Sequence, residues 1–376
     1  MSVEKITIVH VGDFLGYPPV ISLIENLLNK NIKVSVISSS EFTKIPNKII
    51  CSDLFQYIYT PYNSNKGVFP KLIRFFSDRR KLRIAVENSM KDSDILWTTT
   101  DVAIKILGNQ LMKYKHIMQL MELVQRQPLF LKSRYYDFPI AHYARAAYKV
   151  VVPDLDRAYI QQAWWDLKVV PTVLPNKPYS IDSENLSTET LRALEIMGNE
   201  KRKILFYAGY ISSERNIVDF ARAVSKRSDY CLYMIGQSDP HDDELNKLLQ
   251  ENNVVYLGNH QAPAHLEFFK YAHIGLTPYL PARSNNHPEI NALYCAPNKV
   301  YEYSAFGVPM IGTNVLGLLR PFEQFGIGRC AKEMTVPEIL KCIDYIDAHY
   351  EEMSQNCLDF FAKDDLDQIV KEIIEE

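Results

Sequence analysis

The sequence predicts two α/β domains in tandem, each built on a mainly parallel, doubly wound sheet of the Rossmann-like kind. Short runs rich in β-branched residues alternate with helical patterns, which is typical of a parallel sheet covered by helices on both faces. The alternation stops once, in a polar stretch over residues 180–202 that we interpret as an interdomain connection, and then resumes. We therefore expect domains over residues 1–178 and 179–345, followed by a C-terminal helix over 346–376.

The predicted strands fall into two series along the chain. The first series covers residues 6–11, 32–38, 95–98, 116–121, 150–153 and 172–174. The second covers residues 204–208, 231–235, 254–257, 274–277 and 308–312. Parallel strands end at one edge of their sheet, so two such domains are expected to face a central cleft that holds ligands at these edges. Residues from 337 onwards carry apolar side chains at helical spacing and are predicted to be helical.

Composition and charge exclude several classes of protein. The chain has 376 residues, enough for two domains with their own cores. Its net charge of −3 argues against general nucleic-acid binding. The first strand begins almost at the N-terminus and is followed by polar, Gly and Pro residues, so neither a signal peptide nor a membrane-spanning helix is predicted. We expect a cytoplasmic protein.

The cysteines give no sign of a metal site or a disulfide framework. There are six, and they form neither a Cys-x-x-Cys pair nor a pattern with histidines at metal-ligand spacing. We expect reduced thiols, located mainly in the core, and no bound metal. They are Cys51, Cys231, Cys295, Cys330, Cys342 and Cys357.

The most informative segment covers residues 297–309. It predicts a short helix that starts at Asn298 and ends at Gly307, followed by an apolar strand. Lys299 and Glu302 share one face near the helix N-terminus, where N–H groups and the helix dipole attract phosphate. The lysine adds a positive charge, and the carboxylate can accept hydrogen bonds from two ribose hydroxyls, so the face can bind a nucleoside diphosphate. The alternative is an ordinary surface helix with a Lys–Glu pair.

This segment resembles the donor-binding segment of nucleotide-sugar glycosyltransferases with the GT-B fold, particularly the family 4-like enzymes. The resemblance implies that Glu302 holds the ribose of a UDP-sugar or GDP-sugar donor, that the helix start at Asn298 holds its phosphates, and that the final helix crosses back to the first domain. One position departs from the pattern: Tyr294 stands where many family 4 members carry a second Glu. The matching residues are Pro297, Lys299, Glu302, Ala305, Gly307 and Pro309.

A second segment of the same half is similar to the family pattern. The strand at 204–208 runs into Gly209 and a turn before the next helix, like the family's strand–Gly–Arg–x–x–x–Glu–Lys–Gly turn. In that turn the basic residues reach the donor diphosphate. Arg215 falls on the Lys position and keeps its charge, whereas Tyr210 replaces the usual Arg. The alternative is a plain βα turn with a solvated arginine.

In the first half, a loop with Gly12, Asp13 and Gly16 follows the first strand. It lies where the family has a glycine-containing loop near the diphosphate and the acceptor. Glycine lets a backbone approach a ligand closely, and Asp13 could act as a base or orient an acceptor hydroxyl. Alternatively, the glycines serve the dihedral angles of a turn, and Asp13 caps a helix.

Glu122 is the second candidate base. It follows the strand at 116–121 and so would lie at the carboxyl edge of the sheet, where a carboxylate could take the proton of an attacking hydroxyl in inverting transfer. The alternative is a surface acid at a strand end. We interpret His10, within an apolar strand, as a core residue.

The stretch from Lys66 to Arg83 is basic, with aromatic and aliphatic residues interleaved. Such a stretch can lie on an anionic lipid leaflet, where each basic residue contributes about 1 kcal/mol. It would suit a peripheral position at the inner face of the membrane. The alternative is a helix with core aromatics and solvated charges. Its basic residues are Lys66, Lys71, Arg74, Arg79, Arg80, Lys81 and Arg83.

These features predict a metal-independent glycosyltransferase that moves a sugar from a nucleoside diphosphate sugar to a hydroxyl. The expected acceptor is a glycan or a lipid-linked glycan precursor of bacterial surface polysaccharide. Two alternatives stay open: a nucleotide-sugar epimerase of the same fold, and a scaffold or binding subunit without catalysis. The sequence leaves the donor base, the sugar and the stereochemical outcome open.

Overall fold

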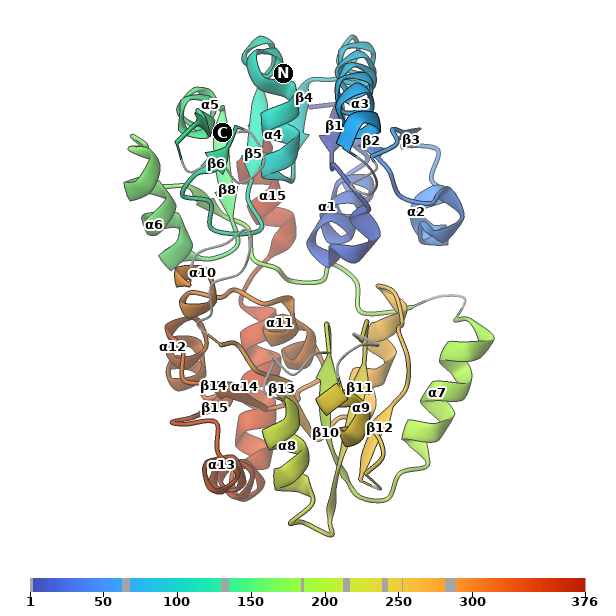
Figure 1. The fold of residues 1–376 in the computed structure, drawn as a ribbon, viewed down its shortest axis with the longest axis vertical. Helices are drawn as coiled ribbons and strands as arrows, with labels where there is room; N and C mark the ends of the chain where they lie inside the picture. The colour runs from blue at the N-terminus through green and yellow to red at the C-terminus, as the bar shows by residue number, and fades with distance from the viewer. Residues whose placement is uncertain are drawn as a thin grey trace. The chain divides into compact units, whose positions relative to one another are not determined.

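In the computed structural model the chain forms two compact units (Figure 1). Unit 1 comprises Met1–Pro175 and Asp365–Glu376, and unit 2 comprises Asn176–Asp364. The structure describes residues 3–62, 68–129, 135–183, 186–211, 217–238, 243–251, 253–280 and 289–375, and the side chains of 68–76 and 243–245 lie outside that description.

Within the described part of unit 1, seven strands form one sheet in the order β3-β2-β1-β4-β5-β8-β9. Every neighbouring pair in it is parallel. A separate antiparallel pair joins β6 (Gln127–Pro128) to β7 (Asp137–Phe138). The main strands are β1 (Lys5–Val9), β2 (Lys33–Ser38), β3 (Phe55–Tyr59), β4 (Ile95–Thr98), β5 (His116–Gln119), β8 (Lys149–Val152) and β9 (Thr172–Val173).

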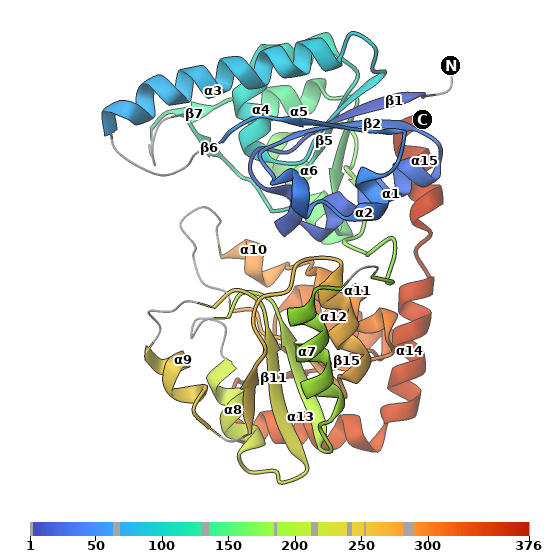
Figure 2. The same ribbon diagram turned by 90° about the vertical axis from the view of Figure 1, so that its right-hand side faces the viewer.

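Helices cover both faces of this sheet, and its central strands are therefore buried on both sides. Figure 2 shows α3 and α4 on one face and α1 on the other, and α15 packs beside α1. The helices are α1 (Pro18–Asn29), α2 (Asn47–Ile50), α3 (Val68–Ser89), α4 (Asp101–Leu107), α5 (Ile140–Ala146), α6 (Leu155–Trp165) and α15 (Leu366–Glu375), with 3-10 turns η1 (Phe14–Gly16), η2 (Phe42–Lys44) and η3 (Gly108–Lys113).

Unit 2 repeats this plan with six parallel strands among its described residues, in the order β12-β11-β10-β13-β14-β15. Buried side chains form one cluster on each face of the sheet. The strands are β10 (Lys203–Ala208), β11 (Tyr230–Ile235), β12 (Val254–Tyr256), β13 (Ile274–Thr277), β14 (Met310–Thr313) and β15 (Gly328–Ala331).

The two clusters assign the helices of unit 2 to opposite faces of the sheet. One face carries α7 (Thr188–Gly198), the 3-10 helix η5 (Ala264–Tyr271), α11 (Asn298–Ala305), α12 (Leu316–Phe325) and α14 (Tyr350–Ala362). The other carries α8 (Ile217–Val224), α9 (Asp243–Leu248) and α13 (Val336–Ala348). The short α10 (Ile290–Leu293) precedes α11.

Both sheets reverse their strand order at one place. In unit 1 this switch point lies between β1 and β4, and in unit 2 it lies between β10 and β13. Ligands of doubly wound folds bind outside the carboxyl ends of the strands at such points. The loops after these four strands are therefore the first places to look for functional groups.

The structure differs from the sequence-based expectations in some elements. The polar stretch read as a connection contains α7, whose cap is the Ser187 hydroxyl accepting from Thr190 N–H, and whose Leu194 and Met197 enter the core. The strand expected at 308–312 begins only at Met310. The C-terminal segment forms three helices, and the unit boundary falls after Asp364 because α14 packs on α11 within unit 2. Strands β3 and β15 were not predicted.

Candidate functional site

The switch point of unit 2 brings together two of the predicted donor residues, Gly209 and Lys299. Gly209 directly follows β10 and has a φ of +148°, a backbone conformation that residues other than glycine rarely adopt. A Cβ atom at this position would lie 2.9 Å from Nζ of Lys299 and 3.0 Å from its Cε. The ammonium group therefore lies directly against the backbone of the turn after β10.

Two tyrosine rings flank the same ammonium group. Nζ of Lys299 lies 5.4 Å from the ring centroid of Tyr207 and 5.6 Å from that of Tyr279, within cation–π range. Tyr207 belongs to β10, and its hydroxyl donates a hydrogen bond to the carbonyl of Tyr210. Tyr279 follows β13, and its N–H donates to Oγ1 of Thr313. Groups at the ends of the two strands beside the switch point thus position the cation.

Helix α11 starts at this place (Figure 1). Its N-cap residue is Pro297, whose side chain cannot accept a hydrogen bond from the first turn. The positive end of the helix dipole therefore lies at Asn298 without a capping side chain from the N-cap residue. Tyr303 anchors the helix, because its ring is fully buried and its hydroxyl donates to the carbonyl of Phe206 over 2.6 Å. Gly307, with a φ of +63°, follows the helix end, as the sequence predicts.

Glu302, the residue predicted to bind the ribose, belongs to α11. Its side chain is buried, and its Oε1 lies 3.2 Å from Nε2 of His265, which belongs to η5. The other ring nitrogen of His265, Nδ1, is buried and has no hydrogen-bond partner among the described residues. The histidine fixes the orientation of the carboxylate. Sequence reasoning missed His265, because it belongs to no motif and contacts Glu302 only through the tertiary fold.

The second predicted phosphate contact is not described by the structure. Arg215 lies outside the described residues. Tyr210, which replaces the usual Arg, is about half exposed, with 47% of its surface accessible. Tyr294, which replaces the second Glu, ends the short helix α10. Among the described donor candidates, Gly209 and Lys299 are in contact, and Lys299 shares helix α11 with Asn298 and Glu302.

The predicted loop in unit 1 lies directly after β1. Gly12 has a φ of +111°, which favours glycine, and its carbonyl accepts hydrogen bonds from the Ser38 hydroxyl and the Ser39 N–H. A Cβ atom at either Gly12 or Gly16 would meet no other atom within 4 Å. The loop therefore has open space beside its glycines, as expected of backbone that a ligand can approach.

Asp13 has the contacts of a helix cap. Its Oδ1 accepts from the Leu15 N–H at 3.1 Å, and this bond caps the 3-10 turn η1. The same oxygen accepts from the Ser40 hydroxyl at 2.6 Å. The alternative interpretation from the sequence is therefore seen in the structure. The residue is also exposed, so its carboxylate is both oriented and accessible. A catalytic role for it stays a prediction.

Glu122 lies just beyond β5, with 45% of its side chain exposed. Its Oε2 is 3.4 Å from a guanidinium nitrogen of Arg157, and that nitrogen also donates to the carbonyl of Met121. Burial, and then the negative charges of Glu122 and Asp101, raise the pKa of the Tyr17 hydroxyl. Glu122 is therefore within electrostatic reach of the loop after β1.

His10 lies next to this loop and is almost fully buried. Its Nδ1 is 2.9 Å from the Thr99 hydroxyl, and its ring centroid is 4.6 Å from that of Tyr17. Burial lowers the pKa of His10 to about 4, although the charge of Asp13 acts in the opposite direction. It is therefore a neutral ring at pH 7. His10 is thus buried, as expected of a core residue. Its Nε2, however, has no hydrogen-bond partner among the described residues.

The basic stretch forms part of α3, and the described part of it is used partly inside unit 1. Lys66 lies outside the described residues, as do the side chains of Lys71 and Arg74. Arg79 and Arg83 donate hydrogen bonds to the carbonyls of residues 105 and 106 in the last turn of α4. Burial lowers the pKa of Arg79. Arg80 and Lys81 are exposed.

Neither a membrane-spanning helix nor a metal-binding cluster is present among the described residues. None of the helices described is long and apolar enough to cross a membrane. No group of three or more His, Cys, Asp or Glu side chains in the described ranges could hold a metal ion. Five of the six cysteines are at least partly buried, whereas Cys51 is exposed.

Comparison with solved structures decides the fold. No protein-family model matches the chain, and no curated protein matches it in sequence. HepE from Anabaena, solved with UDP and glucose, superposes with a TM-score of 0.69 at 13% identity, covering 99% of this chain and 98% of that one. The chain has the GT-B fold.

Other GT-B proteins superpose over the same length. WaaG, a glycosyltransferase involved in lipopolysaccharide biosynthesis, has a TM-score of 0.62 at 15% identity, covering 98% of this chain and 99% of that one. A Listeria monocytogenes protein assigned as a UDP-N-acetylglucosamine 2-epimerase has a TM-score of 0.59 at 12% identity, covering 100% and 97%. The structures that superpose on this chain thus include glycosyltransferases and a protein assigned as an epimerase, and the reaction has to be argued from the residues.

Proposed function

We propose that this protein is a glycosyltransferase that moves a sugar from a nucleoside diphosphate sugar to a hydroxyl group. The observation that carries the proposal is the position of the Lys299 ammonium against Gly209, beside the start of α11 at the switch point of unit 2. A cation and a helix N-terminus at one place form a site for a diphosphate.

The donor would bind to unit 2. Lys299 and the first N–H groups of α11 would neutralise the charge that develops on the leaving diphosphate. Because Oε1 of Glu302 contacts His265, the ribose hydroxyls would bind to its other oxygen. Arg215 would add a second positive charge. Structures of HepE with UDP and with UDP-glucose support a UDP-type donor as the first to test.

The acceptor would be activated by a carboxylate of unit 1. In the reaction, the acceptor oxygen bonds to the anomeric carbon, the bond from that carbon to the diphosphate breaks, and the hydroxyl proton passes to the base. Glu122 and Asp13 are the two candidates, since both are exposed and both are oriented by hydrogen bonds or ion pairs. Of the two, Glu122 is not engaged in capping a helical turn.

We place the acceptor among glycans or lipid-linked glycan precursors of bacterial surface polysaccharide. The role of WaaG in lipopolysaccharide biosynthesis supports this choice by analogy. A cytoplasmic protein at the inner face of the membrane would suit a lipid-linked acceptor. In the described part of α3, the exposed Arg80 and Lys81 are the residues that would contact anionic lipid.

An epimerase is the second candidate, supported by the Listeria protein of the same fold. A scaffold without catalysis is the third, supported by Tyr210 and Tyr294 at positions where the family pattern has charged residues. The deciding experiment incubates the protein with UDP- and GDP-sugars, with and without simple glycosides as acceptors, and separates the nucleotides by chromatography. Acceptor-dependent release of UDP or GDP supports transfer. An isomerised nucleotide sugar would support the epimerase, and no turnover of any donor would support the scaffold.

A further inference from the structure

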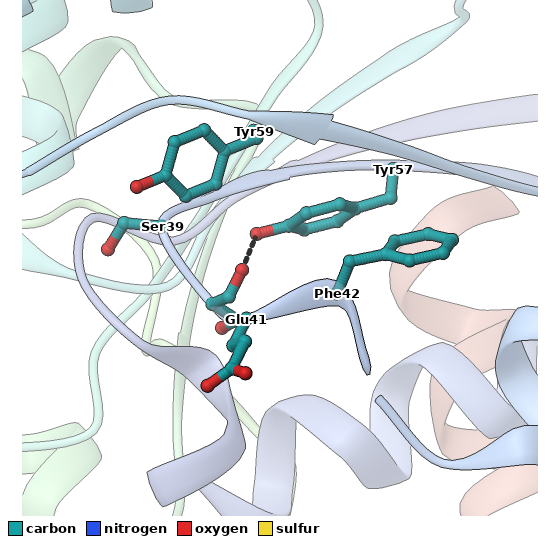
Figure 3. Close-up of a pocket in the computed structure, with 6 residues that line it drawn as sticks. Ser39, Glu41, Phe42, Tyr57 and Tyr59 are labelled. Carbon is teal, nitrogen blue, oxygen red and sulfur yellow. Dashed lines mark hydrogen bonds between the residues drawn. The ribbon is translucent and has the colours of Figure 1, made fainter. Parts of the chain in front are cut away.

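A cavity of about 500 Å³ opens on unit 1 where β2 and β3 end (Figure 3). It lies within the size range of small-molecule sites. Two stretches of chain line it, the turn after β2 and the outer strand β3. Its lining residues are Ser39, Ser40, Glu41, Phe42, Tyr57 and Tyr59.

Aromatic side chains form the apolar part of this cavity. Tyr57 and Tyr59 are two residues apart on β3 and so lie on the same face of the strand. Phe42 lies 6.0 Å from the Tyr57 ring, centroid to centroid. Tyr59 and Phe42 are exposed to 61% and 53% of their surface. Large aromatic rings that stay exposed around a hollow are typical of binding surfaces.

Polar groups complete the lining. The Tyr57 hydroxyl donates to the Ser40 carbonyl over 2.7 Å, which holds the turn after β2 in place (Figure 3). Ser39, Glu41 and the Tyr59 hydroxyl bring further oxygen atoms to the cavity. Among the lining residues, Glu41 alone is charged, and its carboxylate pairs with Lys44 over 2.7 Å and accepts a hydrogen bond from the Thr43 hydroxyl. The lining therefore brings no unpaired positive charge that would select a phosphate or another anion.

A neutral sugar ring combines the features that this lining requires. A pyranose has an apolar face of C–H groups that can pack on an aromatic ring, and hydroxyls around its edge that can donate to a carboxylate or exchange hydrogen bonds with serine and tyrosine hydroxyls. An aliphatic or aromatic ligand would leave these oxygen atoms without partners on the ligand side.

The cavity is also connected to the loop after β1. Ser38, Ser39 and Ser40 hydrogen-bond to the carbonyl of Gly12 and to the carboxylate of Asp13. A ligand in the cavity would therefore lie against the same turn that orients a candidate catalytic carboxylate. The donor groups, in contrast, belong to unit 2.

We propose that the cavity lined by Phe42, Tyr57 and Tyr59 binds a neutral pyranose ring, with Glu41 and Ser39 as partners of its hydroxyls. Its role as the acceptor's sugar rests on the proposed glycosyltransferase function, whereas binding itself does not. None of these residues follows from the sequence motifs, since they come from two separate elements that parallel pairing places side by side.

Saturation-transfer NMR on the full chain tests the proposal. The probes are the methyl glycosides of glucose, galactose, mannose and N-acetylglucosamine, with p-nitrophenol as an aromatic probe and UDP in the same series. We expect transfer to the C–H protons of at least one glycoside. Tyr59→Ala should reduce this signal roughly tenfold, and Tyr59→Phe should reduce it less because the ring remains. Tyr159→Ala on α6, another exposed tyrosine of unit 1, is the control.

Three outcomes would overturn the proposal: no glycoside signal with the wild type, a glycoside signal that Tyr59→Ala and Phe42→Ala leave unchanged, or binding of p-nitrophenol alone. The UDP signal separates this proposal from the proposed function. UDP binding without glycoside binding would remove the sugar cavity and leave the donor site. Glycoside binding that depends on Tyr59, without binding of any nucleotide, would leave the cavity and remove the glycosyltransferase proposal.

Discussion

The ammonium of Lys299 lies 2.9 Å from the position that a Cβ atom on Gly209 would occupy. The two residues are far apart in the sequence, and the switch point of the unit 2 sheet brings them together. The φ of +148° favours glycine at the end of β10, and a Cβ atom there would also displace the end of the Lys299 side chain. Substitution of Gly209 therefore tests whether Lys299 binds the nucleotide at this turn.

Gly209→Ala should weaken nucleotide binding strongly. The new methyl group would strain the backbone and displace the Lys299 ammonium from the turn. We expect the Kd for UDP, measured by calorimetry, to rise at least tenfold, equivalent to about 1.4 kcal/mol. Gly198→Ala at the end of α7 is the control, because its φ is not positive and its Cβ would meet only the half-exposed ring of Tyr271. Equal affinity in Gly209→Ala and the wild type would show that the lysine does not act at this turn.

Glu302→Gln should distinguish ribose binding from phosphate binding. A neutral amide keeps the shape of the side chain but is a weaker acceptor for ribose hydroxyls, and hydrogen bonds to charged groups contribute about 1.5–3 kcal/mol. We expect the Kd for UDP to rise roughly tenfold or more, while that for inorganic pyrophosphate stays the same. His265→Ala should act in the same direction, because it removes the group that orients the carboxylate. A parallel loss of pyrophosphate binding in Glu302→Gln would contradict the assignment.

The two candidate bases can be separated by kinetics. Replacing the base should lower kcat by about 10²- to 10⁴-fold and leave UDP affinity unchanged, because the base acts on the acceptor. Glu122→Gln and Asp13→Asn are to be compared in the transfer assay with Glu87→Gln, an exposed acid on α3, as control. We expect the larger loss for Glu122→Gln, since Asp13 has a structural cap to maintain. Full activity in both variants would exclude both residues as the base.

Stability should fall as the pH decreases from 6.5 towards 4. Burial lowers the pKa of His10 to about 4 and that of His116 to about 3, from an ordinary value of 6.5. Between these limits the unfolded chain binds more protons than the folded one, so their full contribution is present above pH 6.5 and is lost as the pH falls through the folded values. Each histidine changes the free energy of unfolding by up to about 1.4 kcal/mol per pH unit.

Urea unfolding at pH 7, 6, 5 and 4.5 measures this dependence. His10→Gln, which removes one of the two titrating groups, should make the free energy of unfolding less steep over the same range. His142→Gln removes a less buried histidine of unit 1 and serves as the control. The same slope in His10→Gln and the wild type would rule out His10 as a source of the pH dependence.

The sequence predicted the fold class correctly because buried parallel strands leave a strong pattern of apolar runs. The α11 segment was predicted with its start and end, since Pro297 favours the start of a helix and Gly307 its end for local conformational reasons. Helix α7 was missed because its few apolar residues, such as Leu194 and Met197, are spread through a polar stretch. Strand β3 was missed because it lies at the sheet edge and buries little of its length.

The site was only partly predictable. Gly209, Lys299 and Glu302 carry motif signals, and the structure adds how the first two meet. His265 could not be predicted, because its contact with Glu302 depends on the packing of η5 against α11. The aromatic cavity could not be predicted either, since it needs the pairing of β2 with β3. Contacts between elements that are distant in the sequence require the tertiary structure.

Calorimetric titration of the full chain with UDP, GDP, CDP and ADP, in the wild type and in Lys299→Ala, is the most direct test of the donor site. Lys341→Ala, at an exposed lysine of α13, is the control. We expect one nucleotide, with UDP tested first, to bind the wild type and the control equally, and Lys299→Ala to bind it at least tenfold more weakly. Equal binding in all three proteins, or no binding of any nucleotide to the wild type, would contradict the donor site and with it the proposed glycosyltransferase.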